Sequence, residues 1–105
     1  MNNLAALYKK QGDFAAAQPL YRETLDGRRD MLGNRHPDTL TSLNNLATLL
    51  QAVGTLEALQ EAEPLLAEAA ETASQAPMLG PDHPHTKIFA KNLDECRKKL
   101  KGAAR

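Results

Sequence analysis

Cysteine and aromatic residues are scarce in this chain of 105 residues, and neither sign of charge is in excess. The single cysteine, Cys96, excludes an intramolecular disulfide and is typical of a reducing compartment. Two Tyr, two Phe and no Trp leave few bulky side chains from which to build one compact core. Thirteen Lys plus Arg balance thirteen Asp plus Glu, so no net charge draws the chain toward nucleic acid or an anionic membrane.

Long hydrophobic runs are also missing. No stretch approaches the roughly 20 apolar residues that span a bilayer. The opening residues Met1-Asn2-Asn3 lack both the basic and the apolar segment of a signal peptide. We therefore expect a cytoplasmic protein that has no membrane partner.

The chain contains an internal repeat. The segment 32–39 reads LGNRHPDT and segment 79–86 reads LGPDHPHT, while NNLA at 2–5 returns at 44–47. The two copies are 42 residues apart at the NNLA segment and 47 residues apart at the His-Pro segment, so the second unit is five residues longer. Three of the extra residues enter between Gly54 and Pro64 and two near 75–77, where we expect turns. A unit of this size cannot bury its own apolar face, so neighbouring units must stack into a continuous core.

Apolar residues within each unit have helical spacing. Leu43, Leu46, Ala47 and Leu50 fall at i, i+3, i+4 and i+7, which is one face of an α-helix. This spacing predicts helices over about 2–11, 14–31, 37–53, 57–75 and 84–101. Met1 already occupies a core position of the first helix, so we expect further repeats of a longer chain to stack before it.

Capping residues and prolines mark the ends of these predicted helices at matching places in both units. We expect glycine at helix C-caps, Asp or Thr at N-caps and proline at first helical positions. The residues in these roles are Gly12 and Gly54, Asp13 and Thr55, and Pro37 and Pro84. Pro19 and Pro64 fall inside predicted helices, where each removes one backbone hydrogen bond, and we expect a slight bend there but no break.

These features together resemble tetratricopeptide repeats. The resemblance rests on LNNLA at 43–47, EAEPL at 61–65, the turn glycine and the Leu-Gly-x-x-His-Pro linker. The 42-residue spacing and the His-Pro linker resemble the kinesin-light-chain and nephrocystin-like subgroup. The resemblance implies an all-α, right-handed solenoid of about 2.5 repeats. Its parts are a first repeat over 1–36, a longer second repeat over 37–83, and a terminal polar helix over 84–105.

The third unit departs from the repeat pattern. Asp94 takes the place of Ala47, and Arg97 takes the place of Leu50. Its helix has therefore lost the apolar face that would receive another helix. We interpret it as a polar cap of the kind that such arrays need for solubility.

The resemblance also implies a concave groove, lined by the first helix of each unit, that holds an extended or short helical peptide. The implied groove positions are Asn2, Ala6, Lys9, Asn44, Thr48, Gln51, Lys91, Glu95 and Lys98, with Asn3, Asn45 and Asn92 at the edge. An Asn amide can donate to and accept from a peptide backbone at once, and the lysines favour an acidic peptide. Ala6 and Glu95 do not support this interpretation. The alternative role for the Asn residues is to bond a neighbouring helix.

Catalytic, metal and nucleic-acid motifs do not assemble in this sequence. His36, His83, His85 and Cys96 lack the spacing of metal ligands. There is no Gly-rich phosphate loop and no nucleophile motif, and no aromatic residue interleaves the basic segment 97–101. We expect no cofactor, no metal, no nucleic-acid partner and no enzymatic activity. The chain is predicted to be a peptide-binding scaffold, with two alternatives: a terminal cap fragment of a longer array, or a regulatory module attached to an enzymatic domain elsewhere in the polypeptide.

Overall fold

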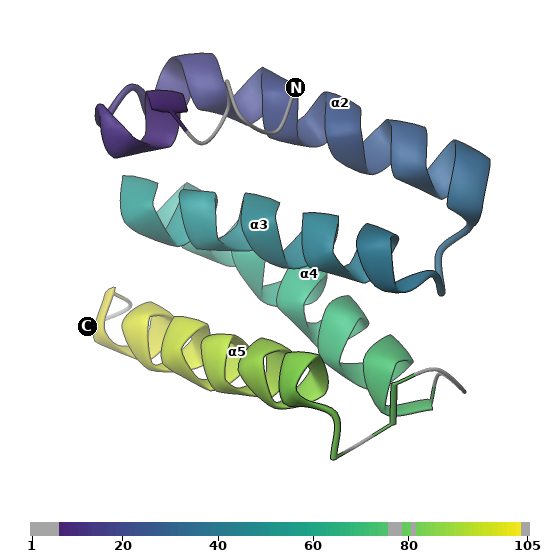
Figure 1. The fold of residues 1–105 in the computed structure, drawn as a ribbon. Helices are drawn as coiled ribbons and strands as arrows, with labels where there is room; N and C mark the ends of the chain where they lie inside the picture. Colours follow the sequence, from purple (N-terminus) through teal and green to yellow (C-terminus); the bar gives the residue numbers. More distant parts are fainter. Residues whose placement is uncertain (1–6, 76–78, 81, 104–105) are drawn as a thin grey trace.

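The fold is a stack of α-helices (Figure 1). The computed structural model describes residues 7–75, 79–80 and 82–103. Within them lie α2 (Phe14–Leu32), α3 (Pro37–Val53), α4 (Leu56–Gln75) and α5 (Pro84–Ala103), and no strand. Residues 7–10 are also helical, whereas the start of the predicted helix 2–11 lies outside the described residues. The other four helices agree with the predicted ranges to within two residues at each end.

Local capping explains why the helices begin and end where they do. The carboxylate of Asp13 accepts from the backbone N–H of Ala16 at 3.1 Å, and the hydroxyl of Thr55 accepts from the N–H of Ala58 at 3.2 Å. Gly54 ends α3 in the left-handed conformation, with a φ of 80° that only glycine adopts readily. The predicted capping roles of these residues are confirmed.

The two His-Pro linkers use histidine as a helix cap. Nδ1 of His36 accepts from the backbone N–H of Asp38, and Nδ1 of His83 accepts from that of His85, each at 3.0 Å. The proline that follows each histidine opens α3 or α5, where a missing N–H leaves no intrahelical bond unmade. A structural role in helix initiation therefore accounts for both histidines.

Both internal prolines are accommodated within continuous helices. Pro19 lies inside α2 and Pro64 inside α4, and neither helix is interrupted. The prediction that these prolines would not break their helices is confirmed.

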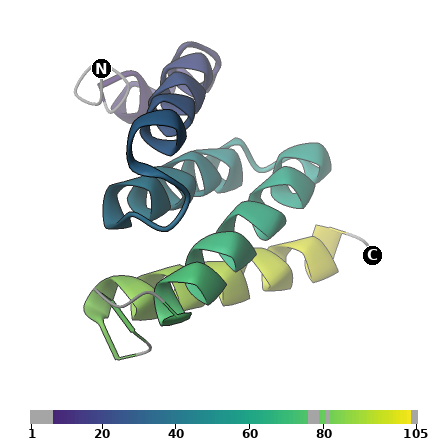
Figure 2. The ribbon, with the colours of Figure 1, turned by 90° about the vertical axis from the view of Figure 1, so that its right-hand side faces the viewer.

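The core is distributed between layers. Each of the four helices packs on the next, and α3 also contacts α5; Figure 2 shows α4 inclined across α5. The buried apolar side chains of α3 are mainly leucines: Leu40, Leu43, Leu46, Ala47, Leu49 and Leu50. Those of α4 mix small and large side chains: Ala58, Leu59, Ala62, Leu66, Ala69 and Ala73. Each fully buried leucine contributes about 1.5–3 kcal/mol. The alanines let the two helices approach closely.

Helix α5 keeps only part of the buried surface that α3 has. Phe89 and Cys96 lie 47 residues after Ser42 and Leu49, and all four side chains are buried. The buried residues Leu40, Leu43, Ala47 and Leu50 of α3 correspond instead to Lys87, Ala90, Asp94 and Arg97 of α5, all of which are exposed. The face of α5 that packs on α4 is therefore retained, and the remaining face is polar.

None of the helices in the described ranges is long and apolar enough to cross a membrane.

Candidate functional site

Three of the amide residues predicted to line the groove come together between α3 and α5. The side-chain N–H of Asn92 donates to the side-chain oxygen of Asn44 at 2.8 Å. The side chain of Gln51 donates to the backbone carbonyl of Asn92 at 3.4 Å. These three residues hold α5 against α3, and Gln51 is buried there, at 9% exposure. The alternative role expected for the Asn residues, a hydrogen bond to a neighbouring helix, is therefore observed between Asn44 and Asn92.

A second polar contact joins the first unit to α3. Nζ of Lys9 donates to the hydroxyl of Thr48 at 3.5 Å, and that hydroxyl donates to the backbone carbonyl of Asn45 at 3.0 Å. A lysine ammonium has three donors, so Lys9 keeps donors for a ligand. Asn2, Asn3 and Ala6 lie outside the described residues.

The α5 part of this surface is more exposed and carries charges of both signs. Lys91 and Glu95 are exposed. Lys98 forms an ion pair with Asp94 at 3.1 Å, with side chains 75% and 67% exposed. An exposed pair of this kind contributes little and leaves the lysine available. Ile88, which is 47% exposed and one turn before Lys91, adds an apolar side chain that the sequence interpretation missed. We name the surface formed by Asn44, Lys91, Asn92 and Lys98 the amide surface; the buried Gln51 is not part of it.

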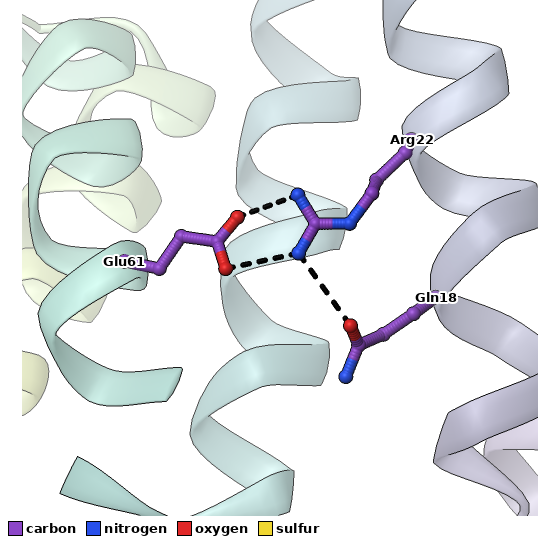
Figure 3. A network of polar contacts seen from close by, with 3 residues as sticks. All are labelled: Gln18, Arg22 and Glu61. Atoms are coloured by element: carbon purple, nitrogen blue, oxygen red, sulfur yellow. Dashed lines mark hydrogen bonds and ion pairs between the residues drawn. The ribbon is translucent and has the colours of Figure 1, made fainter. Parts of the chain in front are cut away.

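Ion pairs between α2 and α4 join the two units elsewhere on the stack. The guanidinium of Arg22 donates to both carboxylate oxygens of Glu61, and Gln18 accepts from the same guanidinium (Figure 3). Two helical turns further along, Arg29 pairs with Glu68 at 3.1 Å. These two ion pairs connect α2 with α4. The sequence shows the matching seven-residue spacing of the two Arg and the two Glu, but no pairing was predicted from it.

Arg22 and Glu61 each shift the pKa of the other. The hydrogen bonds from Arg22 lower the pKa of Glu61, against the opposing effect of burial. The hydrogen bond to Glu61 raises the pKa of Arg22. Both side chains are about two-fifths exposed, at 42% and 41%, so solvent screening limits the stabilisation to less than about 1 kcal/mol.

Cys96 is a core residue. Its thiol is fully buried and donates to the backbone carbonyl of Leu59 at 3.5 Å. Burial raises the pKa of the Cys96 thiol, and the nearby carboxylate of Glu63 adds to the shift. Among the residues with described positions, no group of three His, Cys, Asp or Glu side chains is arranged to hold a metal ion.

Comparison with known families decides what kind of repeat this is. A family model described as Tetratricopeptide repeat matches residues 1–59, which is more than half of the chain. The chain belongs to the tetratricopeptide repeat family. The match confirms the family and the all-α solenoid predicted from the repeated motifs, whereas the kinesin-light-chain-like subgroup stays a prediction. A search of curated proteins returned no match.

Tetratricopeptide repeats generally mediate protein–protein interaction and are generally not catalytic. In this chain the repeat motifs on α3 and α5 are the ones that carry the amide surface.

Proposed function

We propose that this tetratricopeptide repeat chain is a non-catalytic scaffold that binds a peptide segment of a protein partner along the amide surface. The observation that carries the proposal is the bond between Asn92 and Asn44. The hydrogen bonds found among the described residues use neither the amide N–H group of Asn44 nor the side-chain oxygen of Asn92. Both side chains are half-buried and reach solvent. One free donor next to one free acceptor matches the C=O and N–H of a bound backbone.

The charges around the amide surface favour an acidic segment. Lys9, Lys91 and Lys98 supply positive charge along it, while Glu95 is the opposing charge. Of these lysines, Lys91 is exposed and has no ion-pair partner among the described residues. Charge pairs at such a rim steer association and weaken with salt. Lys91 is therefore the residue proposed to select acidic peptides.

A peptide library displayed on phage tests this proposal. Peptides selected on the chain should be enriched in Asp and Glu, and Lys91→Ala should weaken them at least tenfold, or about 1.4 kcal/mol. Lys101→Ala is the matched control, because Lys101 is also exposed and carries the same charge, and it lies ten residues further along α5, outside the amide surface. Selected peptides without acidic enrichment, whose affinity is the same for both variants, would contradict the proposal.

A second candidate function is a terminal cap of a longer array. The polar residues Lys87, Asp94 and Arg97 favour it, since they occupy positions that are buried and apolar in α3. In that case peptide binding by this segment should be weak, while the polar helix keeps the array soluble. The kinesin-light-chain-like subgroup and a cytoplasmic location remain part of the proposal.

A further inference from the structure

The two helices that carry the amide surface begin with a cap that requires neutral histidine. Nδ1 of His36 accepts from the backbone N–H of Asp38 at the start of α3, and Nδ1 of His83 accepts from that of His85 at the start of α5. Helix α2 begins instead with a carboxylate cap, and α4 with a hydroxyl cap. Carboxylate and hydroxyl oxygens remain acceptors between about pH 5 and 8, whereas a histidine nitrogen does not.

Protonation turns the accepting nitrogen of each histidine into a donor. A neutral imidazole that accepts at Nδ1 carries its one proton on Nε2, while a histidinium has a proton on both nitrogens and can accept nothing. The added proton also places a positive charge beside the positive end of the helix dipole, which is unfavourable. Below about pH 6, where an ordinary histidine is mostly charged, a cap of this kind is therefore lost.

Other contacts hold the start of α3 when its histidine cap is lost. Arg28 of α2 donates to the backbone carbonyl of Asp38 at 3.0 Å. The hydroxyl of Thr39 donates to the backbone carbonyl of Gly33 at 2.8 Å. The first turn of α3 is thus joined to α2 and to the preceding linker by hydrogen bonds that do not involve histidine.

The start of α5 does not show these additional contacts within the part of the chain that the structure describes. Thr86, at the place of Thr39, has a hydroxyl with no hydrogen-bond partner there. Lys87, at the place of the fully buried Leu40, is exposed. Besides backbone hydrogen bonds, the one found at this turn is the bond that His83 accepts. The first turn of α5 therefore depends on its cap more than the first turn of α3 does.

An open cleft beside this turn adds to the difference between the two helices. It lies between α4 and α5 and has a volume of about 410 Å³. Small or charged side chains form much of its lining: Ala70, Glu71, Thr86, Lys87 and Ala90. Ala70 and Ala90 stand where the preceding unit has the buried Leu25 and Leu43. The cleft leaves this side of α5 uncovered, so an unwound first turn has room to move.

Charges of both signs surround His83. The charged or titratable side chains beside it, and at the nearest positions of the two helices that α5 contacts, are Asp82, His85, Lys87, Glu71 of α4 and Asp38 of α3. The ring of His85 is 5.0 Å from that of His83, measured between centroids. The carboxylates favour uptake of a proton by His83, and Lys87 opposes it. With both signs present, mild acid is sufficient to protonate His83.

We propose that the first turn of α5 is a pH-sensitive element, which neutral His83 holds in helical form and which unwinds in part when His83 takes up a proton. The first turn of α3 is its insensitive counterpart, because Arg28 and Thr39 hold that turn in addition to its cap. No residue of the amide surface takes part, so the proposal does not rest on peptide binding.

Backbone ¹³Cα chemical shifts, which report the helical population of each residue, test the proposal at about pH 7.5 and about pH 5. At Thr86 and Lys87 the ratio of helical to unwound chain should fall roughly fivefold at the lower pH, which is the loss expected for one N-cap. At the equivalent residues Thr39 and Leu40, the same ratio should change by less than about twofold, since further hydrogen bonds remain.

Three variants identify the group that responds to pH. His83→Asn keeps an acceptor that does not titrate, so it should abolish the fall at Thr86. His36→Asn is the matched control and should leave the fall unchanged. His85→Gln should also leave it unchanged, because His85 contributes its backbone N–H to the cap and not its ring. Circular dichroism at the helix band confirms that each variant is folded.

Four outcomes would overturn the proposal. They are no fall at Thr86 in the parent chain, a fall that persists in His83→Asn, a fall that disappears in His85→Gln, and an equal fall at Thr39. The acidic-peptide selection on Lys91 is unaffected by these outcomes, so this proposal and the proposed function fail separately.

Discussion

Two equivalent threonines allow the energetics of the stack to be tested with one substitution. Thr39 and Thr86 each lie two residues after the proline of a His-Pro segment, near the start of a helix, and are 0% and 5% exposed. The hydroxyl of Thr39 donates to Gly33, whereas that of Thr86 has no partner in the described part of the chain. Replacement by valine keeps the branched shape and nearly the same helix propensity, so the hydroxyl is the main change.

The predicted effects of the two substitutions have different signs. Thr39→Val removes a hydrogen bond and leaves the carbonyl of Gly33 without that donor, which should lower the free energy of unfolding by about 1–2 kcal/mol. Thr86→Val removes an unpaired buried hydroxyl and should leave stability unchanged or raise it by up to about 1 kcal/mol. For a domain of this size, a loss of 1 kcal/mol corresponds to a fall in Tm of about 4–8 °C.

Urea unfolding followed by circular dichroism at the helix band measures both variants. The m-value serves as the control, because a changed slope would show that a variant alters cooperativity as well as stability. Repeat arrays unfold partly by unit, so the comparison of two equivalent positions is safer than either absolute value. An equal loss for the two variants, or a larger loss for Thr86→Val, would refute the assignment of paired and unpaired hydroxyls.

Two further predictions concern ionisable groups. The pKa of Glu61 is lower in the folded chain than in the unfolded chain. The ionised carboxylate therefore stabilises the fold above the ordinary Glu pKa of about 4.3, and this stabilisation is lost as the pH falls through the lower folded pKa. Glu61→Gln should therefore lower the free energy of unfolding by less than about 1 kcal/mol at pH 7. Below about pH 4 the difference in unfolding free energy between the variant and the parent chain should become smaller. Urea unfolding at both pH values measures this difference. The thiol of Cys96 should react with an alkylating reagent at least about tenfold more slowly in the folded chain than in urea, because it is buried and its pKa is raised. Equal rates, followed by mass spectrometry, would contradict its place in the core.

The helices were predictable because the signals that define them are local. Asp13 and Thr55 accept from N–H groups three residues away, and Pro37 opens its helix directly after the capping residue His36. Such contacts join residues that are close together in the chain, so the sequence is sufficient to locate them. The small and large residues of α4 likewise follow from a 3.6-residue period.

Contacts between units were less predictable because they depend on how the helices are rotated and offset. Arg22 and Glu61 are 39 residues apart, and many other Arg and Glu residues of this chain could have been paired on spacing alone. The amide residues were placed on one surface by the family resemblance. Only the structure shows that Asn44 and Asn92 bond each other. The substitution of Leu25 and Leu43 by Ala70 and Ala90 is visible in the sequence, but the cleft that results is not.

The two faces of α5 explain how one helix can contact the preceding unit and still present new chemistry. Phe89 and Cys96 keep the apolar contact that every stacked unit needs, so α5 stays fixed against α4. Other positions of α5 carry exposed side chains where α3 has buried apolar ones, as at Asp94 and Ala90.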